Sequence, residues 1–197
     1  DWYFNFEYEI EKLRGLDSTE DLFQPCLLRF DLSTNSRAVV VASLEPRLAT
    51  LATPMIKRET ARRAALCEAA ADPVDCALAK AADQFIVTRG SHKSVLAGFP
   101  WFTDWGRDAM ISLPGLTLAT GRFDDARSVL LAFAQAMTRG VLPNRFADAG
   151  ETAEYNTVDA TLWLFEALRA YVEATGDFGI VRDHLFESLE ESVEWHI

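Results

Sequence analysis

The sequence predicts a mainly α-helical protein in which paired helices follow a short β segment. From about Pro54 onward, apolar residues recur with helical spacing, and short polar loops separate the successive runs. The first 45 residues instead carry aromatic and aliphatic residues in strand-like alternation. We therefore expect residues 1–45 to be the C-terminal end of a β domain and residues 46–197 to be a domain of helical hairpins.

A repeat within the helical part indicates that its helices are paired. Ala119–Phe123 reads Ala-Thr-Gly-Arg-Phe, and Ala174–Phe178 reads Ala-Thr-Gly-Asp-Phe, 55 residues later. In each copy the Gly follows a predicted helix, where a left-handed C-cap is common. The paired helices are predicted over residues 108–120 with 124–138 and over residues 157–175 with 178–194. Stacked hairpins of this kind form either an open solenoid or a closed α/α toroid.

The remaining elements are predicted from local patterns. Strand-like runs cover residues 2–10, 26–32 and 37–42, and two further helices are expected over residues 55–71 and 74–88. Pro114 should kink or split the helix predicted over residues 108–120, because proline lacks the backbone N–H. Residues 89–106 are rich in Gly, Pro and aromatic side chains, so a long loop is expected there.

The charge of the chain limits its partners. A formal net charge of −11 disfavours nucleic acid and anionic membrane surfaces, whereas a neutral polysaccharide meets no electrostatic penalty. No stretch approaches the ~20 apolar residues of a membrane-spanning helix. The histidines at 92, 184 and 196 are scattered, so we expect no metal and no cofactor.

The cysteine content favours a reducing compartment. Cys26, Cys67 and Cys76 match neither a zinc site nor a disulfide framework. The expectation is three reduced thiols in a cytoplasmic protein, with a Cys67–Cys76 bridge as the alternative.

Three stretches carry the side chains needed to bind a sugar. They are residues 98–108, 142–145 and 154–160. The candidate binding residues are Trp101, Asp104, Trp105, Arg107, Asp108, Asn144, Arg145, Tyr155 and Asn156. Aromatic faces can stack on a sugar ring, while carboxylate, amide and guanidinium groups can bond to its hydroxyls. The alternative interpretation is structural, with Asp108 or Asn156 capping a helix and the tryptophans in the core.

Asp159 is the candidate general acid. Hydrolysis of a glycosidic bond needs one carboxylic acid to protonate the leaving oxygen and a second carboxylate to act at the anomeric centre. Asp159 lies in the first turn of the helix predicted over residues 157–175, and we expect burial and neighbouring carboxylates to raise its pKa. An Asp at this position could equally serve only to favour the helix dipole.

Taken together, these stretches resemble the amylo-α-1,6-glucosidase domain of glycogen debranching enzymes of the bacterial and archaeal type. The matching segments are Gly98-Phe-Pro-Trp-Phe-x-x-Trp-Gly-Arg-Asp108, Leu142-Pro-Asn-Arg145, Tyr155-Asn-Thr-Val-Asp-Ala160 and Thr175-Gly-Asp177. Arg14–Phe23 resembles the end of the β domain that precedes the helices in that family. The resemblance implies an (α/α)6 toroid that hydrolyses α-1,6-linked glucose stubs of glycogen-like α-glucans with inversion.

The resemblance also implies roles for individual residues. Asp159 would be the general acid, with Trp105, Arg107 and Asp108 holding the sugar. The general base of the family is a Glu in the second half of the toroid, which implies a position beyond Ile197. On this interpretation residues 46–197 are the first half of the toroid, and the chain alone would turn over substrate negligibly.

Two other functions fit the same residues. One is a different glucosidase on the same toroid, such as a trehalase-like or oligosaccharide-processing enzyme. The other is a non-catalytic glucan-binding helical module, in which Asp159 is merely a helix-start residue. The acidic residues at 187, 190, 191 and 194 fall on one polar helix face and are expected to be solvated.

Overall fold

The computed structural model describes residues 1–34, 36–146 and 152–197, in two compact units of residues 1–56 and 57–197. Each unit is treated by itself. Of the helices in the described ranges, none combines the length and apolar character needed to cross a membrane.

The first unit contains a two-stranded antiparallel sheet. Strand β1 (Trp2–Glu7) pairs with β2 (Thr19–Phe23), and the short helix α1 (Glu9–Leu13) lies between them in sequence. The pairing runs from Trp2 opposite Phe23 to Glu7 opposite Thr19, with an irregularity between Tyr3 and Phe6. A 3-10 turn, η1 (Ala49–Leu51), leads into α2 (Ala52–Ala65), which continues into the second unit.

The prediction of strands at residues 26–32 and 37–42 is wrong. Residues 26–32 and 37–42 have no regular secondary structure, whereas β2 forms in a segment that the pattern did not single out. A strand needs a neighbour to satisfy its backbone N–H and C=O groups. In the described part of this unit β1 takes β2 as its neighbour, and the strand propensity of the other two runs is not realised.

In the second unit a disulfide joins the turn after α2 to α3 (Pro73–Asp83). After α2, helix α3 starts at Asp72, whose carboxylate accepts hydrogen bonds from the N–H groups of Val74 and Asp75. The intervening turn brings the Cα atoms of Cys67 and Cys76 to 4.7 Å, and the two cysteines are bonded. The expectation of three reduced thiols is therefore wrong, and only the alternative bridge is observed. The cysteines then no longer favour a reducing compartment.

A β-hairpin follows α3 where the sequence pattern indicated a longer helix and a loop. Strand β3 (Ile86–Arg89) pairs with β4 (His92–Val95) over the full length of both. Gly90 has φ +58° in the turn, a conformation that glycine adopts without steric strain. Because Ile86, Val87 and Thr88 are β-branched, they favour strand over helix once a partner is present.

The helices of the repeated hairpins form as the sequence predicts. They are α4 (Gly106–Leu113) with the π-helical segment η2 (Pro114–Leu118), α5 (Phe123–Gln135), α6 (Asp159–Thr175), and the π-helical segment η3 (Val181–Leu185) with α7 (Phe186–His196). The α-helix of α4 ends directly before Pro114, which splits the predicted helix as expected. Gly176 is the C-cap of α6 with φ +70°, and Gly121 lies in the turn after η2 with φ +72°, so both repeat glycines occupy the left-handed conformation.

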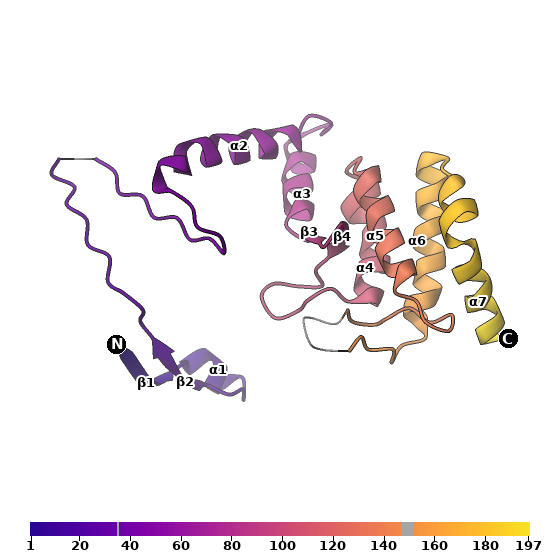
Figure 1. Cartoon of the computed structure of the whole chain (residues 1–197), viewed down its shortest axis with the longest axis horizontal. Helices are drawn as coiled ribbons and strands as arrows, with labels where there is room; N and C mark the ends of the chain where they lie inside the picture. The colour runs from indigo at the N-terminus through magenta and orange to yellow at the C-terminus, as the bar shows by residue number, and fades with distance from the viewer. Residues whose placement is uncertain (35, 147–151) are drawn as a thin grey trace. The chain divides into compact units, whose positions relative to one another are not determined.

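The hydrophobic core lies among these helices. Figure 1 shows α4, α5, α6 and α7 side by side, and α4 packs on α6 while α5 packs on both α6 and β4. The largest fully buried side chains include Met110, Leu113, Leu130, Phe133 and Leu164. A mainly helical fold with small two-stranded sheets is thus confirmed, and the parallel packing of α4 and α6 sets their first turns at the same end.

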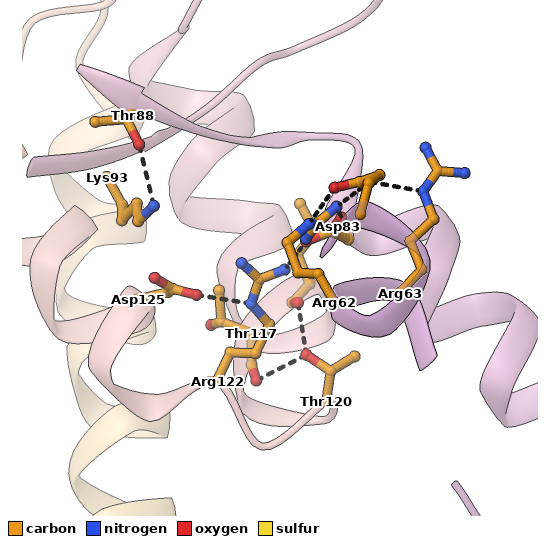
Figure 2. Close-up of polar contacts among 11 residues, drawn as sticks. Arg62, Arg63, Asp83, Thr88, Lys93, Thr117, Thr120, Arg122 and Asp125 are labelled. Carbon is orange, nitrogen blue, oxygen red and sulfur yellow. Dashed lines mark hydrogen bonds and ion pairs between the residues drawn. The ribbon is translucent and has the colours of Figure 1, made fainter. Parts of the chain in front are cut away.

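An ion-pair chain fastens α2 and α3 to the start of α5. Asp83, whose side chain is 10% exposed, accepts from the guanidinium groups of Arg62 at 2.7 Å and Arg122 at 2.8 Å. Arg122 also contacts Asp125 at 2.7 Å (Figure 2). Both arginines lower the pKa of Asp83, with the hydrogen bonds from Arg62 as the larger cause. The ionised carboxylate therefore stabilises the fold above the pKa of an unfolded Asp, and this contribution is lost as the pH falls.

Replacing Asp83 by Asn should lower the free energy of unfolding by about 2 kcal/mol, because two arginines lose their shared, largely buried acceptor. Urea unfolding at neutral pH measures this loss. Glu166→Gln is the matched control, since Glu166 pairs with Arg169 on the surface with both side chains more than half exposed. Equal stability of the two variants would show that the Asp83 pairs contribute no more than a surface pair.

Candidate active site

The first turns of α4 and α6 meet through charged side chains. The Nε atom of Arg107, on α4, lies 3.0 Å from Oδ2 and 3.1 Å from Oδ1 of Asp159, on α6. An Nη atom of Arg107 donates to the hydroxyl of Thr157 at 3.3 Å. Since both helices begin here, the positive ends of their dipoles lie near the carboxylates of Asp108 and Asp159.

Backbone hydrogen bonds hold the loop of residues 142–145 against this end. The N–H of Gly106 donates to the carbonyl of Asn144 at 2.7 Å, and the N–H of Asn144 donates to the carbonyl of Glu154 at 2.7 Å. Arg145 forms isolated bridges with Trp105 on one side and Glu154 on the other. The structure thus brings together all three stretches that the sequence singled out.

Gly106 permits the close approach of this loop. A Cβ atom at residue 106 would overlap the carbonyl oxygen of Pro143 and would press on the side chain of Leu142 at 3.3 Å. Leu142 itself is fully buried, and its N–H donates to the hydroxyl of Thr161 at 2.9 Å. A glycine at the first position of α4 is therefore required by contact rather than by backbone conformation.

The polar side chains of the loop are engaged with the segment before α6. Asn144 Nδ2 donates to Asn156 Oδ1 at 2.9 Å, and Arg145 pairs with Glu154 at 2.9 Å. The hydroxyl of Tyr155 donates to the carbonyl of Ala136 at 2.8 Å. The capping alternative for Asn156 is not observed, because α6 has Val158 at its N-cap and no side-chain cap.

Asp104 does not have the exposure expected of a sugar-binding residue. It is 2% exposed, and its carboxylate accepts from the hydroxyl of Ser94 at 2.8 Å and from Arg89 at 3.3 Å. A buried carboxylate needs such partners to offset its loss of hydration. In this structure Asp104 ties the loop before α4 to β3 and β4, and its contact with sugar stays a prediction.

The other residues before and within the first turn of α4 remain accessible. Trp101 is 76% exposed, so the core alternative does not apply to it, while Trp105 is half-buried with its ring edge-on to Phe102 at 6.5 Å. Asp108 is exposed and borders an open groove of about 310 Å³ beside Ile111 and Ser112. No side chain caps α4, so the capping alternative for Asp108 is also not observed.

Asp159 has the opposite electrostatic environment to the one expected. The hydroxyl of Thr157 donates to its carboxylate and is the largest cause that lowers its pKa, and the charge of Arg107 acts in the same direction. Its side chain is 47% exposed, so burial does not dominate. The prediction of a raised pKa is wrong for the chain as it stands. Because the folded pKa is lowered, these contacts stabilise the fold above the pKa of an unfolded Asp and are lost as the pH falls.

Sequence reasoning missed Thr157. It lies within the quoted Tyr-Asn-Thr-Val-Asp segment, but a threonine beside a helix start is common and nothing in the pattern distinguishes it. Its 8% exposure and its bonds to two charged side chains are visible only in the structure.

Gly106→Ala should lower the free energy of unfolding by about 1–3 kcal/mol, because the added methyl forces the backbone of residues 142–144 away from α4. Gly115→Ala is the control, since a Cβ at residue 115 meets no atom within 4 Å. Thermal unfolding of both variants measures the difference. A stable Gly106→Ala variant would mean that the loop yields without cost.

Arg107→Gln should raise the pKa of Asp159, because the variant removes the positive charge next to the carboxylate. Carboxyl-detected NMR titration of the chain measures the change. Arg169→Gln provides the comparison, since Arg169 pairs with Glu166 and Glu173 on the same helix and has no contact with Asp159. An unaltered pKa in Arg107→Gln would contradict the electrostatic role given to Arg107.

Comparison with known proteins agrees with the motifs. Residues 80–197 match the family described as Amylo-alpha-1,6-glucosidase, and residues 1–39 match the family described as Glycogen debranching enzyme N terminal. A segment of 89 residues is 43% identical to the glycogen debranching enzyme of Saccharomyces cerevisiae. That segment covers 43% of this chain and 6% of the yeast protein, so the chain spans a small part of this relative.

Proposed function

The chain belongs to the amylo-alpha-1,6-glucosidase family, and on that premise we propose that it contributes to the hydrolysis of α-1,6-glucosidic branch points. The substrate class is a glycogen-like α-glucan, and the product is free glucose. A neutral glucan is compatible with the net charge of −11, which would repel anionic polymers.

The convergence of Arg107, Thr157 and Asp159 is the observation that carries this proposal. Two helices begin side by side with a carboxylate in the first turn of each, and an exposed tryptophan lies on the loop that leads into one of them. Such an arrangement offers hydrogen-bonding groups for sugar hydroxyls and an aromatic face for the ring. We assign sugar binding to Trp101, Trp105, Arg107 and Asp108, with Asn144, Arg145, Tyr155 and Asn156 shaping the adjacent loop.

In the proposed reaction Asp159 gives its proton to the glycosidic oxygen as the bond to the leaving sugar breaks. For this step the carboxyl must be protonated, whereas its contacts in the free chain favour the ionised form. A glucan that draws the guanidinium of Arg107 onto its hydroxyls would remove one of these contacts. Substrate binding would therefore raise the pKa of Asp159 and prepare it as the acid.

Inversion requires a second carboxylate that activates water on the opposite face of the sugar, about 6.5–9.5 Å from the acid. We assign Asp108 to sugar binding rather than to this role, because it lies on the helix next to Arg107. In the family toroid the base is expected from the second half of the ring.

Glucose release from a phosphorylase-type limit dextrin tests the proposal, with the complete gene product carrying Asp159 or Asp159→Asn. The rate of glucose release should fall roughly 10²-fold or more in the variant, the usual effect of losing a general acid. Asp124→Asn is the matched control, because Asp124 is likewise an exposed first-turn carboxylate, on α5. It should retain full release.

Three other results would count against parts of the proposal. Full release by Asp159→Asn would remove Asp159 as the acid. Release from trehalose but not from the branched dextrin would assign a different substrate. Binding of the dextrin without release by the unaltered protein would indicate a glucan-binding role.

A further inference from the structure

We propose that Thr157 is a positioning residue for proton donation at this site. Its hydroxyl holds the Asp159 carboxylate and the Arg107 guanidinium in one fixed arrangement. The inference rests on the proposed function, because it presupposes that Asp159 is the general acid.

The hydroxyl of Thr157 connects the two charged groups. It donates to Oδ1 of Asp159 and accepts from an Nη atom of Arg107 at 3.3 Å, while Nε of Arg107 lies 3.0 Å from Oδ2 of Asp159. The three side chains therefore form a closed triangle. Since Thr157 engages Oδ1, Oδ2 is the oxygen left to carry the transferable proton once Arg107 turns to a sugar hydroxyl.

Burial gives Thr157 a rigidity that the other two lack. Thr157 is 8% exposed, whereas the side chains of Arg107 and Asp159 are 48% and 47% exposed. An exposed ion pair of long side chains is weakly fixed by itself. A β-branched side chain has few rotamers, and burial restricts it further. The threonine is thus the anchored member of the triangle.

Thr157 does not act as a helix cap. The N-cap of α6 is Val158, which makes no side-chain cap hydrogen bond. The contrast with α3 is direct, because the carboxylate of Asp72 accepts from the N–H groups of Val74 and Asp75. The hydroxyl of Thr157 is therefore directed to side chains and not to stabilising the helix.

Three threonines that lie within helical segments use their hydroxyls differently from Thr157. The hydroxyl groups of Thr117 and Thr175 donate to the carbonyl four residues earlier, and Thr161 accepts from the N–H of Leu142. These bonds are structural. Thr161 lies in the first turn of α6, four residues after Thr157, which precedes the helix, so it is a close comparison for Thr157.

Among the residues that the structure describes, few charged groups lie near the Asp159 carboxylate. On its own helix the first turn adds no other charge, α4 contributes Arg107 in contact and Asp108 one residue further along, and the adjoining loop carries the Arg145–Glu154 pair. When Thr157 is changed, the guanidinium of Arg107 is therefore the main charge that still acts on the pKa of Asp159.

The experiment compares pH–rate profiles for glucose release from limit dextrin by the complete gene product and its Thr157→Val variant. Valine keeps the shape and removes the hydroxyl that favours the ionised carboxylate, so the alkaline limb set by the acid should move to higher pH. The value of kcat should fall about 10- to 100-fold through loss of alignment, with KM changed little. Thr157→Ser restores the hydroxyl, so the alkaline limb should return to its original pH and most of kcat should be recovered.

Thr161→Val is the structural control. It strips the acceptor from the N–H of Leu142 and should lower Tm, yet it should leave the alkaline limb in place. An unchanged profile and kcat in Thr157→Val would overturn the inference. So would failure of Thr157→Ser to recover activity, or an equal limb shift in Thr161→Val. Asp159→Asn, assayed in parallel, distinguishes failure of the proposed function from failure of the role given to Thr157. If Asp159→Asn stays active, Asp159 is not the general acid, whatever the result for Thr157.

Discussion

The close backbone contact between Gly106 and the loop of residues 142–145 is the constraint on which the site depends. Through it the start of α4, the loop and the segment before α6 become one layer, held by hydrogen bonds from Gly106 to Asn144 and from Asn144 to Glu154. Without that contact, the starts of α4 and α6 would be joined only by the side chains of Arg107, Thr157 and Asp159 and by helix packing. The chemistry of the site is therefore fixed by main-chain geometry, and the charged side chains are added to it.

The parts of the fold that were predictable are those with a local cause. Gly121 and Gly176 turn the chain after η2 and α6 because glycine takes positive φ, and Pro114 ends α4 because it lacks an N–H. Strand pairing has a non-local cause, so residues 26–32 resembled strand and residues 19–23 became one. The Cys67–Cys76 bridge likewise depends on how tightly the turn after α2 folds back, which spacing alone does not fix.

The same distinction applies to the candidate site. The motifs single out three segments, and the structure brings them together through hydrogen bonds from Gly106 to Asn144 and from Asn144 to Glu154. What the motifs could not give is the environment of each side chain. Asp104 precedes α4 and Asp108 lies in its first turn, yet Asp104 is buried against Ser94 and Asp108 is exposed. Thr157 is the converse case, an ordinary residue type made important by burial and by its two charged neighbours.

The left-handed glycines after η2 and α6, Gly121 and Gly176, form corners at the end of the helices opposite the site. Each helix that begins at the site ends at one of these corners, so the corners lie a full helix length from Arg107 and Asp159. Short surface connections tolerate inserted residues well when no buried backbone is disturbed. The Gly176 corner can therefore acquire new loops without disturbing the opposite rim, whereas the Gly121 corner is held to α3 by the pair of Arg122 with Asp83.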